Sequence, residues 1–267
     1  MKILVVITTA FTSTGGLTTV MMNYYRAMNK EGLKIDFAST NVPSQSLLDE
    51  IHVEGSEYYQ LPPRKKIVSY FYRLRRLCKN YDLLHVHGNS STSVLELMAA
   101  NWAGVKRRIV HNHTSRSQHP WINLLLHPFF LMSYTKAIAC SDAAGEWLFG
   151  NKQYQILRNA IKVSCFHYDV SVRQQIRQLL GISDSTFLVG HVGKFMDAKN
   201  HPFVIAVFAE IHRLIPNSKL LLVGDGPLRG MVETAVKNLH VEDCVILVGL
   251  RSDIPQLLQS FDVFMLP

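Results

Sequence analysis

Two lysines follow an apolar segment in the second half of the chain. The residues FLVGHV at 187–192 lead into Gly193 and Lys194, and Lys199 follows five residues later, just before a helical pattern. Two ammonium groups that flank a turn at a helix start can both reach one diphosphate and neutralise it as a leaving group without a metal ion. Loop lysines are often only solvated. Open α/β sheets, however, bind ligands at the carboxyl ends of their strands, and this position favours an anion site.

Two glycine turns stand at comparable positions. Gly15 and Gly16 follow the first apolar run and precede a helical pattern, where backbone amides can point at an anion that glycine lets approach closely. Gly224 opens the segment GDGP after another apolar run and can shape a nucleotide pocket. Neither segment is a GxGxxG fingerprint, so an ordinary strand-to-helix turn remains an alternative for both.

Four histidines form two His-x-His pairs. His85 with His87, and His111 with His113, each close a predicted strand, where alternate residues face the same side. Such pairs can ligate zinc, so a zinc-dependent hydrolase is an alternative function. No acidic residue lies close by to complete a hydrolase site, and basic residues crowd positions 106–108. We therefore predict no metal site and expect a single polar histidine to contact substrate.

Residues 64–81, RKKIVSYFYRLRRLCKNY, form a cationic segment of helical character. Its apolar residues Ile67, Tyr70, Phe71, Leu74 and Leu77 can share one face. The helix could rest on an anionic membrane surface, or it could be an ordinary sheet-covering helix with a basic outer face. Nucleic acid binding is not predicted, because the segment belongs to no recognised module. The candidate membrane-facing residues are Lys65, Lys66, Arg73, Arg75, Arg76 and Lys79.

The elements that must position these residues alternate regularly along the chain. Short apolar runs separated by helical segments predict parallel strands covered on both faces. We expect an α/β protein with two doubly wound, Rossmann-like domains: residues 1–160, a linker region 161–185, and residues 186–267. The predicted strands are 3–7, 34–39, 83–87, 108–112, 137–140 and 153–157 in the first domain, and 187–192, 219–223, 245–248 and 262–266 in the second.

Composition narrows the class of protein. The 267 residues are 48% hydrophobic and 18% charged, which fits a globular chain and excludes disorder. The net charge of +8 is uneven: residues 1–160 carry 18 basic and 10 acidic side chains, whereas residues 161–267 carry 10 of each. The first domain therefore faces something anionic.

Three further features indicate a cytoplasmic protein. The four cysteines are scattered, without CxxC spacing or a disulfide framework. The opening apolar run, 3–7, is shorter than the core of about 7 to 15 residues in a secretory signal. The apolar stretch 121–132 is interrupted by Asn123, His127 and Pro128 and falls short of the roughly 20 residues of a membrane span.

Taken in order, the motifs resemble glycosyltransferase family 4, and most of all the bacterial enzymes of capsule, exopolysaccharide and lipopolysaccharide synthesis. The resemblance rests on the glycine pair at 15–16, DLLHVHG at 82–88, IVHNHTS at 109–115, CSD at 140–142, RNAI at 158–161, and then VGKFMDAKNH, LLLVGDGP, VGLRSDIPQLL and FDVFMLP. It implies the GT-B fold, in which two Rossmann-like domains face each other across the active-site cleft.

The resemblance also implies roles for residues. Lys194, where the family more often has arginine, and Lys199 would contact the donor diphosphate, and His113 would be the catalytic histidine near the transferred sugar. Lysine keeps the charge but lacks the two-pronged guanidinium. Ser141 would lie on the acceptor side. The remaining donor-binding residues would be Gly15, Gly16, Gly193, Gly224, Leu250 and Arg251.

The implied reaction is sugar transfer with retention of configuration. The partners would be a nucleotide-sugar, most often a UDP-sugar, and a lipid-linked saccharide acceptor at the inner face of the cell membrane, with no cofactor or metal required. The family's two glutamates, eight positions apart after the last strand, are absent, so we expect a C-terminally truncated chain of little activity with an incomplete second domain. A non-catalytic nucleotide-sugar-binding subunit is a further alternative.

Overall fold

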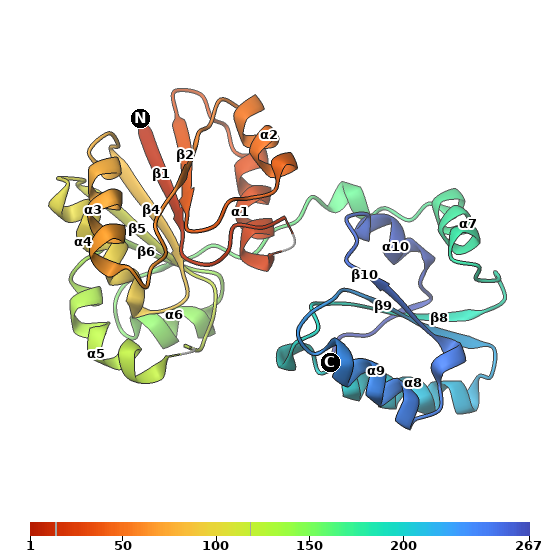
Figure 1. The fold of residues 1–267 in the computed structure, drawn as a ribbon. Coiled ribbons are helices and arrows are strands. Elements are labelled where there is room, and N and C mark those ends of the chain that lie inside the picture. The colour runs from red at the N-terminus through yellow and green to blue at the C-terminus, as the bar shows by residue number, and fades with distance from the viewer. Residues whose placement is uncertain (14, 118) are drawn as a thin grey trace. The chain divides into compact units, whose positions relative to one another are not determined.

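A computed structural model describes residues 1–13, 15–117 and 119–267. The chain forms two compact units, Met1–Ile161 (unit 1) and Lys162–Pro267 (unit 2), and each is described by itself (Figure 1).

Unit 1 is built on a seven-stranded parallel sheet. The strand order is β3-β2-β1-β4-β5-β6-β7, and all six pairings are parallel. The first crossovers run outward from β1 in one direction and the later ones in the other, as in a doubly wound fold. The strands are β1 (Lys2–Ile7), β2 (Lys34–Ser39), β3 (Tyr58–Gln60), β4 (Leu83–Gly88), β5 (Arg107–Asn112), β6 (Lys136–Ala139) and β7 (Gln155–Ile156).

Helices cover both faces of this sheet because successive strand residues point to opposite sides. Val5 and Ile7 belong to the core under α1 (Gly16–Ala27) and α2 (Gln45–Val53). Leu4 and Val6 belong to the core under the other helices, which are α3 (Ile67–Cys78), α4 (Val94–Trp102), α5 (Pro120–Leu131) and α6 (Asp142–Phe149). A short 3-10 turn, η1 (Ser91–Ser93), packs against α5.

Unit 2 repeats the plan on a smaller scale. Its parallel sheet has the order β10-β9-β8-β11. Figure 1 shows α8 and α9 on one side of this sheet and α7 and α10 on the other. The strands are β8 (Phe187–Val192), β9 (Ser218–Val223), β10 (Val245–Gly249) and β11 (Val263–Phe264), and the helices are α7 (Val170–Leu179), α8 (His201–Leu214), α9 (Arg229–Asn238) and α10 (Ile254–Ser260). The 3-10 turns are η2 (Val163–Phe166), η3 (Asp197–Lys199) and η4 (Glu242–Cys244).

The predicted α/β class with parallel sheets is confirmed, and the differences lie in short elements. The edge strand β3 was not expected, because its three residues are too few to give a pattern. The segments 153–157 and 262–266 form only two-residue strands. Residues 161–185, expected as a linker region, include α7, which packs on α10. No helix in the described part of the chain is long and apolar enough to cross a membrane.

Candidate functional site

Three loops meet at the carboxyl edge of the unit 2 sheet, after β8, β9 and β10. Main-chain hydrogen bonds join them. The Gly193 amide donates to the Val223 carbonyl at 2.9 Å, and the Gly224 amide donates to the Gly249 carbonyl at 2.9 Å. The six unit 2 residues expected to bind a donor therefore lie on adjacent loops: Gly193, Lys194, Lys199, Gly224, Leu250 and Arg251.

The segment GDGP fixes the path of the lysine loop. A Cβ atom at Gly224, where φ is +144°, would lie 2.0 Å from the Gly193 carbonyl oxygen. A Cβ at Gly226 would lie 2.5 Å from the Phe195 carbonyl oxygen. Both contacts are with backbone, which cannot move aside without disturbing the sheet edge. The two loops thus pack backbone on backbone, and glycine is required at both positions.

Lys194 and Lys199 carry positive charge on this packed base. The Lys194 side chain is exposed, whereas the Lys199 stem is half-buried and lies against Gly193. Among the described residues, no carboxylate forms an ion pair with either lysine. The six ion pairs in the described part of unit 2 all join arginines to carboxylates. Both ammonium groups are therefore available to an anionic ligand.

Two buried histidines lie under this loop. The rings of His191 and His201 are 4.8 Å apart, and the Nε2 atom of each is buried without a hydrogen-bond partner in the described residues. Burial lowers the pKa of His201 to about 4 and also lowers the pKa of His191. Both imidazoles are neutral at pH 7, so the lysines alone supply the positive charge.

The loop after β10 differs from the lysine loop. Leu250 is exposed, and Arg251 makes two hydrogen bonds of 2.8 and 2.6 Å to the Asp253 carboxylate. This ion pair raises the pKa of Arg251 and lowers the pKa of Asp253. The charge of Arg251 is thus already compensated.

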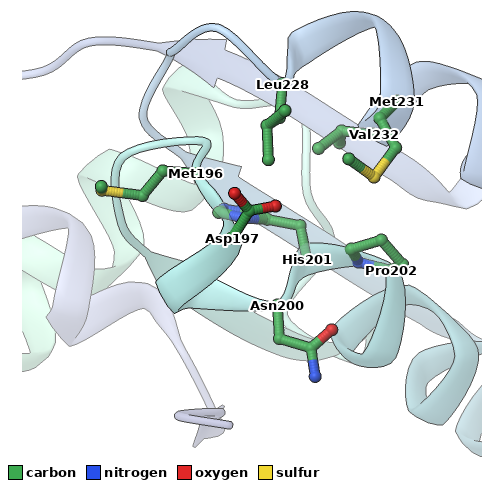
Figure 2. Close-up of a pocket in the computed structure, with 8 residues that line it drawn as sticks. All are labelled: Met196, Asp197, Asn200, His201, Pro202, Leu228, Met231 and Val232. Atoms are coloured by element: carbon green, nitrogen blue, oxygen red, sulfur yellow. The ribbon is translucent and has the colours of Figure 1, made fainter. Parts of the chain in front are cut away.

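A shallow pocket opens beside the lysine loop, between the starts of α8 and α9 (Figure 2). Neither Lys194 nor Lys199 lines it, so it is not where those ammonium groups would hold an anion. Its lining residues are Met196, Asp197, Asn200, His201, Pro202, Leu228, Met231 and Val232.

The glycine pair of unit 1 stands at the start of α1. Gly15 is the N-cap, and a Cβ there would lie 3.0 Å from Thr12 Oγ1. A Cβ on Gly16 would meet nothing within 4 Å. Packing therefore favours glycine at position 15 but does not require it at position 16.

The four histidines of the His-x-His pairs gather at the carboxyl ends of β4 and β5. His87 is paired in register with His111, and its Nδ1 lies 2.9 Å from Nε2 of His113. The His85 and His111 rings are stacked, with centroids 5.8 Å apart. The structure thus brings both pairs into one cluster on the α1 side of the sheet.

The cluster is neutral, with His87 and His111 buried and His85 and His113 half-buried. Burial is the main cause that lowers the pKa of His85 and His113 to about 4, that of His111 to about 2, and that of His87 well below its ordinary value. In the described residues, His85 Nε2 and both ring nitrogens of His111 are buried without a hydrogen-bond partner. Unsatisfied buried nitrogens of this kind are costly and often mark a functional site.

The arrangement can serve two kinds of chemistry. Ring nitrogens of His85, His87 and His111 lie within 4.8 Å of one another, and neutral imidazole is the form that binds metal ions. His113 is half-buried, and because its Nε2 engages His87, its Nδ1 is the ring nitrogen available for a different hydrogen bond. The expected absence of a metal site stays a prediction.

Ser141 has a structural role in the fold. It is the N-cap of α6, and its Oγ accepts a hydrogen bond from the Ala144 amide at 3.2 Å. Its expected acceptor-side role stays a prediction.

The RNAI segment at 158–161 is fixed on α1, since the Asn23 side chain donates to the Ala160 carbonyl at 2.9 Å and the Tyr24 hydroxyl donates to the Arg158 carbonyl.

The basic segment forms α3, shorter than expected. Tyr70 and Leu74 are buried as predicted, but Ile67 is exposed. Arg75 departs from the other candidate membrane-facing residues, because it is half-buried and donates to the Trp102 carbonyl at 3.2 Å. The remaining five cations are exposed: Lys65, Lys66, Arg73, Arg76 and Lys79.

Sequence reasoning missed one buried and one half-buried arginine, each paired with a carboxylate. Arg177 is almost fully buried and binds Asp262 at 2.6 Å, while Arg64 lies 3.0 Å from the buried Glu96. Each arginine lies at one end of a helical segment and resembles a solvated residue in the sequence. The only available signal was a carboxylate that stands within an otherwise apolar run.

Comparison with known proteins identifies both units. The model of the family described as "Glycosyltransferase Family 4" matches residues 14–162, and that described as "Glycosyl transferases group 1" matches residues 172–267.

Named relatives agree with these matches. EpsF of Bacillus subtilis is 27% identical over 95% of this chain and 70% of its own length. An Escherichia coli UDP-Gal:alpha-D-GlcNAc-diphosphoundecaprenol alpha-1,3-galactosyltransferase is 26% identical over 76% of this chain and 55% of its own length. The crystal structure of Anabaena HepE in complex with UDP and glucose has a TM-score of 0.82 at 20% identity, over 99% of this chain and 73% of that one.

Proposed function

The chain belongs to glycosyltransferase family 4, and from this membership we propose that it transfers a sugar from a nucleotide-sugar donor to a lipid-linked saccharide. The observation that carries the donor half of the proposal is the loop with Lys194 and Lys199, two cations at the carboxyl edge of a parallel sheet that form no ion pair within the described residues. The family match favours sugar transfer over the zinc-dependent hydrolase.

The donor in this proposal is a UDP-sugar. Lys194 and Lys199 bind its diphosphate as charge-assisted donors. Gly193 lets the phosphates approach the backbone, Gly224 holds the lysine loop in place by packing against the Gly193 carbonyl, and the main chain at Leu250 and Arg251 contacts the base. The UDP in the HepE structure and the UDP-galactose in the name of the E. coli relative support this choice.

In the proposed reaction, the bond between the anomeric carbon and the β-phosphate oxygen breaks first, and UDP leaves with the electron pair. The acceptor hydroxyl then attacks the same face, and its proton passes to the departing phosphate oxygen, so the configuration is retained. The two ammonium groups stabilise the charge that develops on UDP, which is the largest contribution this loop can make.

His113 acts in this scheme as a neutral polar group. With a pKa lowered to about 4, it carries no charge at pH 7 and cannot compete with the lysines for phosphate. Its free Nδ1 can form one hydrogen bond with a sugar hydroxyl. Gly15 and Gly16 place the α1 amino terminus, with its partial positive charge, near donor phosphate or acceptor.

The acceptor in this proposal is a saccharide on a lipid diphosphate, used in the synthesis of surface polysaccharide. The diphosphoundecaprenol in the name of the E. coli relative supports it. The site of action would be the inner face of the cell membrane.

The proposal is tested first by binding and then by turnover. Calorimetry with UDP, UDP-glucose and UDP-galactose should detect binding, and UMP should bind more weakly because it lacks the second phosphate. With an N-acetylglucosaminyl-diphosphoundecaprenol acceptor, the product should gain one hexose in α linkage, at the low rate expected of a chain without the family's two glutamates. Binding without any product would favour the non-catalytic subunit, and metal-dependent hydrolysis that a chelator abolishes would favour the hydrolase.

A further inference from the structure

Helix α5 exposes an apolar surface that none of the described residues of its unit covers. The helix contains no Lys, Arg, Asp or Glu. Trp121 is 82% exposed, Leu125 is 73% exposed, and Met132, just after the helix, is 83% exposed. Leu124, Pro128 and Phe129 are exposed as well. Helical spacing places all six on one side, which we call the α5 face.

The opposite side of α5 is fixed to the fold, so the helix cannot turn this face inward. The Asn123 side-chain oxygen accepts a hydrogen bond from the Ser91 amide at 2.7 Å, and His127 Nδ1 lies 3.0 Å from the Ser91 hydroxyl. Phe130 is fully buried in the core shared with α3 and α4. A contiguous apolar face of this kind on a globular unit indicates an interaction surface.

The charges on the segment that leads to and includes α5 are mostly positive, whereas α6, which shares the same core, exposes Asp142 and Glu146. Residues 64–132 contain eleven Lys or Arg but only two carboxylates, Asp82 and Glu96. Glu96 is buried and pairs with Arg64, and one oxygen of Asp82 accepts the Lys2 amide at 2.7 Å. Helices α3, α4 and α5 therefore expose no carboxylate among their described residues.

Helix α3 lies on the same face of the sheet, since Tyr70, Leu97 and Phe130 of α3, α4 and α5 share one core. It adds five exposed cations, the residues Lys65, Lys66, Arg73, Arg76 and Lys79, which form no ion pair within the described residues. It also exposes Val68 and Tyr72.

An exposed apolar face on the same side of the sheet as unpaired cations matches the chemistry of one partner. A bilayer that contains anionic phospholipid offers an apolar interior and negative head groups at the same boundary. We propose that the α5 face enters the acyl-chain boundary of an anionic membrane, while the α3 cations contact the head groups. For its biological setting this inference rests on the proposed function, but vesicle binding needs neither donor nor acceptor, so the two can fail separately.

The first test compares two substitutions of equally exposed leucines. Leu125 on α5 and Leu179 on α7 are each 73% exposed, so Leu125→Asp and Leu179→Asp remove the same apolar area and add the same charge. With vesicles of equal parts phosphatidylglycerol and phosphatidylcholine, Leu125→Asp should lower co-sedimentation about tenfold, and Leu179→Asp should change it little. Arg73→Gln with Arg76→Gln should weaken binding to these vesicles more than to pure phosphatidylcholine.

The second test measures how deeply Trp121 enters the bilayer. Trp102→Phe with Trp147→Phe leaves Trp121 as the single indole, because the chain contains three tryptophans. Its emission should shift to the blue on vesicle binding and be quenched by lipids brominated on their acyl chains. Equal binding by wild type and Leu125→Asp, or an unshifted Trp121 emission, would overturn the proposal. The proposal would also be overturned if the wild type were a dimer in solution and Leu125→Asp made it monomeric, since the α5 face would then bind a second copy of the chain.

Discussion

The carboxyl edges of the two sheets both bury neutral imidazoles, but they differ in the polar groups that they expose. At the unit 1 edge, four imidazoles are buried or half-buried, neutral and partly without hydrogen bonds. At the unit 2 edge, two lysines stand at a loop surface and form no ion pair in the described residues. The two units share one architecture, so the difference lies in the side chains. We infer that the unit 2 edge suits a charged diphosphate and the unit 1 edge a neutral sugar.

Backbone packing explains how unit 2 keeps its cations outside. Because Gly224 and Gly226, which follow β9, contact the backbone of the lysine loop directly, a side chain at either position would displace that loop. In unit 1 the histidines lie on the strands themselves, where neighbouring strands and helices enclose them.

The largest expected effect tests the glycine contact. Gly224→Val adds a side chain 2.0 Å from the Gly193 carbonyl at a backbone angle that only glycine adopts readily. We expect a loss of about 3 kcal/mol or more in the free energy of unfolding of unit 2, together with loss of UDP binding. Chemical denaturation followed by circular dichroism measures the first.

The matched control is Gly230→Ala in α9, where a Cβ meets nothing within 4 Å. It should stabilise the helix by about 0.5–1 kcal/mol. Equal stabilities for the two variants would show that the glycine contact does not shape the unit 2 edge.

A second experiment uses pH to sharpen the contrast. Burial holds the pKa of His111 at about 2, below its ordinary value of 6.5. Above pH 6.5 both folded and unfolded forms are neutral; below it only the unfolded form gains the proton, so stability falls as the pH falls. At pH 5 His111 alone should lower the free energy of unfolding by about 2 kcal/mol relative to pH 7.

Tryptophan fluorescence isolates this effect, because Trp102, Trp121 and Trp147 all lie in unit 1. Urea unfolding at pH 7 and pH 5 should show that the free energy of unfolding falls less in His111→Leu than in wild type as the pH is lowered. His52→Leu, at an exposed position of α2, should retain the wild-type loss. The same pH dependence in all three proteins would contradict the neutral cluster.

The smallest expected effect separates structure from function at Ser141. Ser141→Ala removes the cap of α6 and should cost about 1 kcal/mol of stability. If Ser141 also contacts the acceptor, Ser141→Asp, which restores a cap, should recover stability but not acceptor affinity. Recovery of both would leave the residue with its capping role alone.

Long apolar runs made most of the fold predictable. Strands such as 187–192 are buried on both faces and read as continuous hydrophobic segments, so their ends, and the residues that follow, could be located. The three residues of β3 gave no such signal. Alternation within each His-x-His pair predicted a shared side, and the ring centroids lie 4.3 Å apart for His85 and His87 and 4.1 Å apart for His111 and His113.

Other features depend on contacts that no local pattern encodes. The sequence of α5 looks like a buried apolar helix, and only its anchorage through Asn123 and Phe130 determines which side is exposed. The ion pair of Arg177 with Asp262 joins residues from opposite ends of unit 2. The charge state of the histidines follows from burial, which composition cannot supply.

UDP affinity measured by calorimetry on Lys194→Ala and Lys199→Ala tests the central claim most directly. Each substitution should weaken UDP binding about tenfold or more, because each removes a charge-assisted contact to the diphosphate. Uridine, which has no phosphate, should bind the variants and the wild type equally, and Lys237→Ala at an exposed position of α9 should bind UDP normally. Unchanged UDP affinity in both loop variants would contradict the assignment of this loop to the donor.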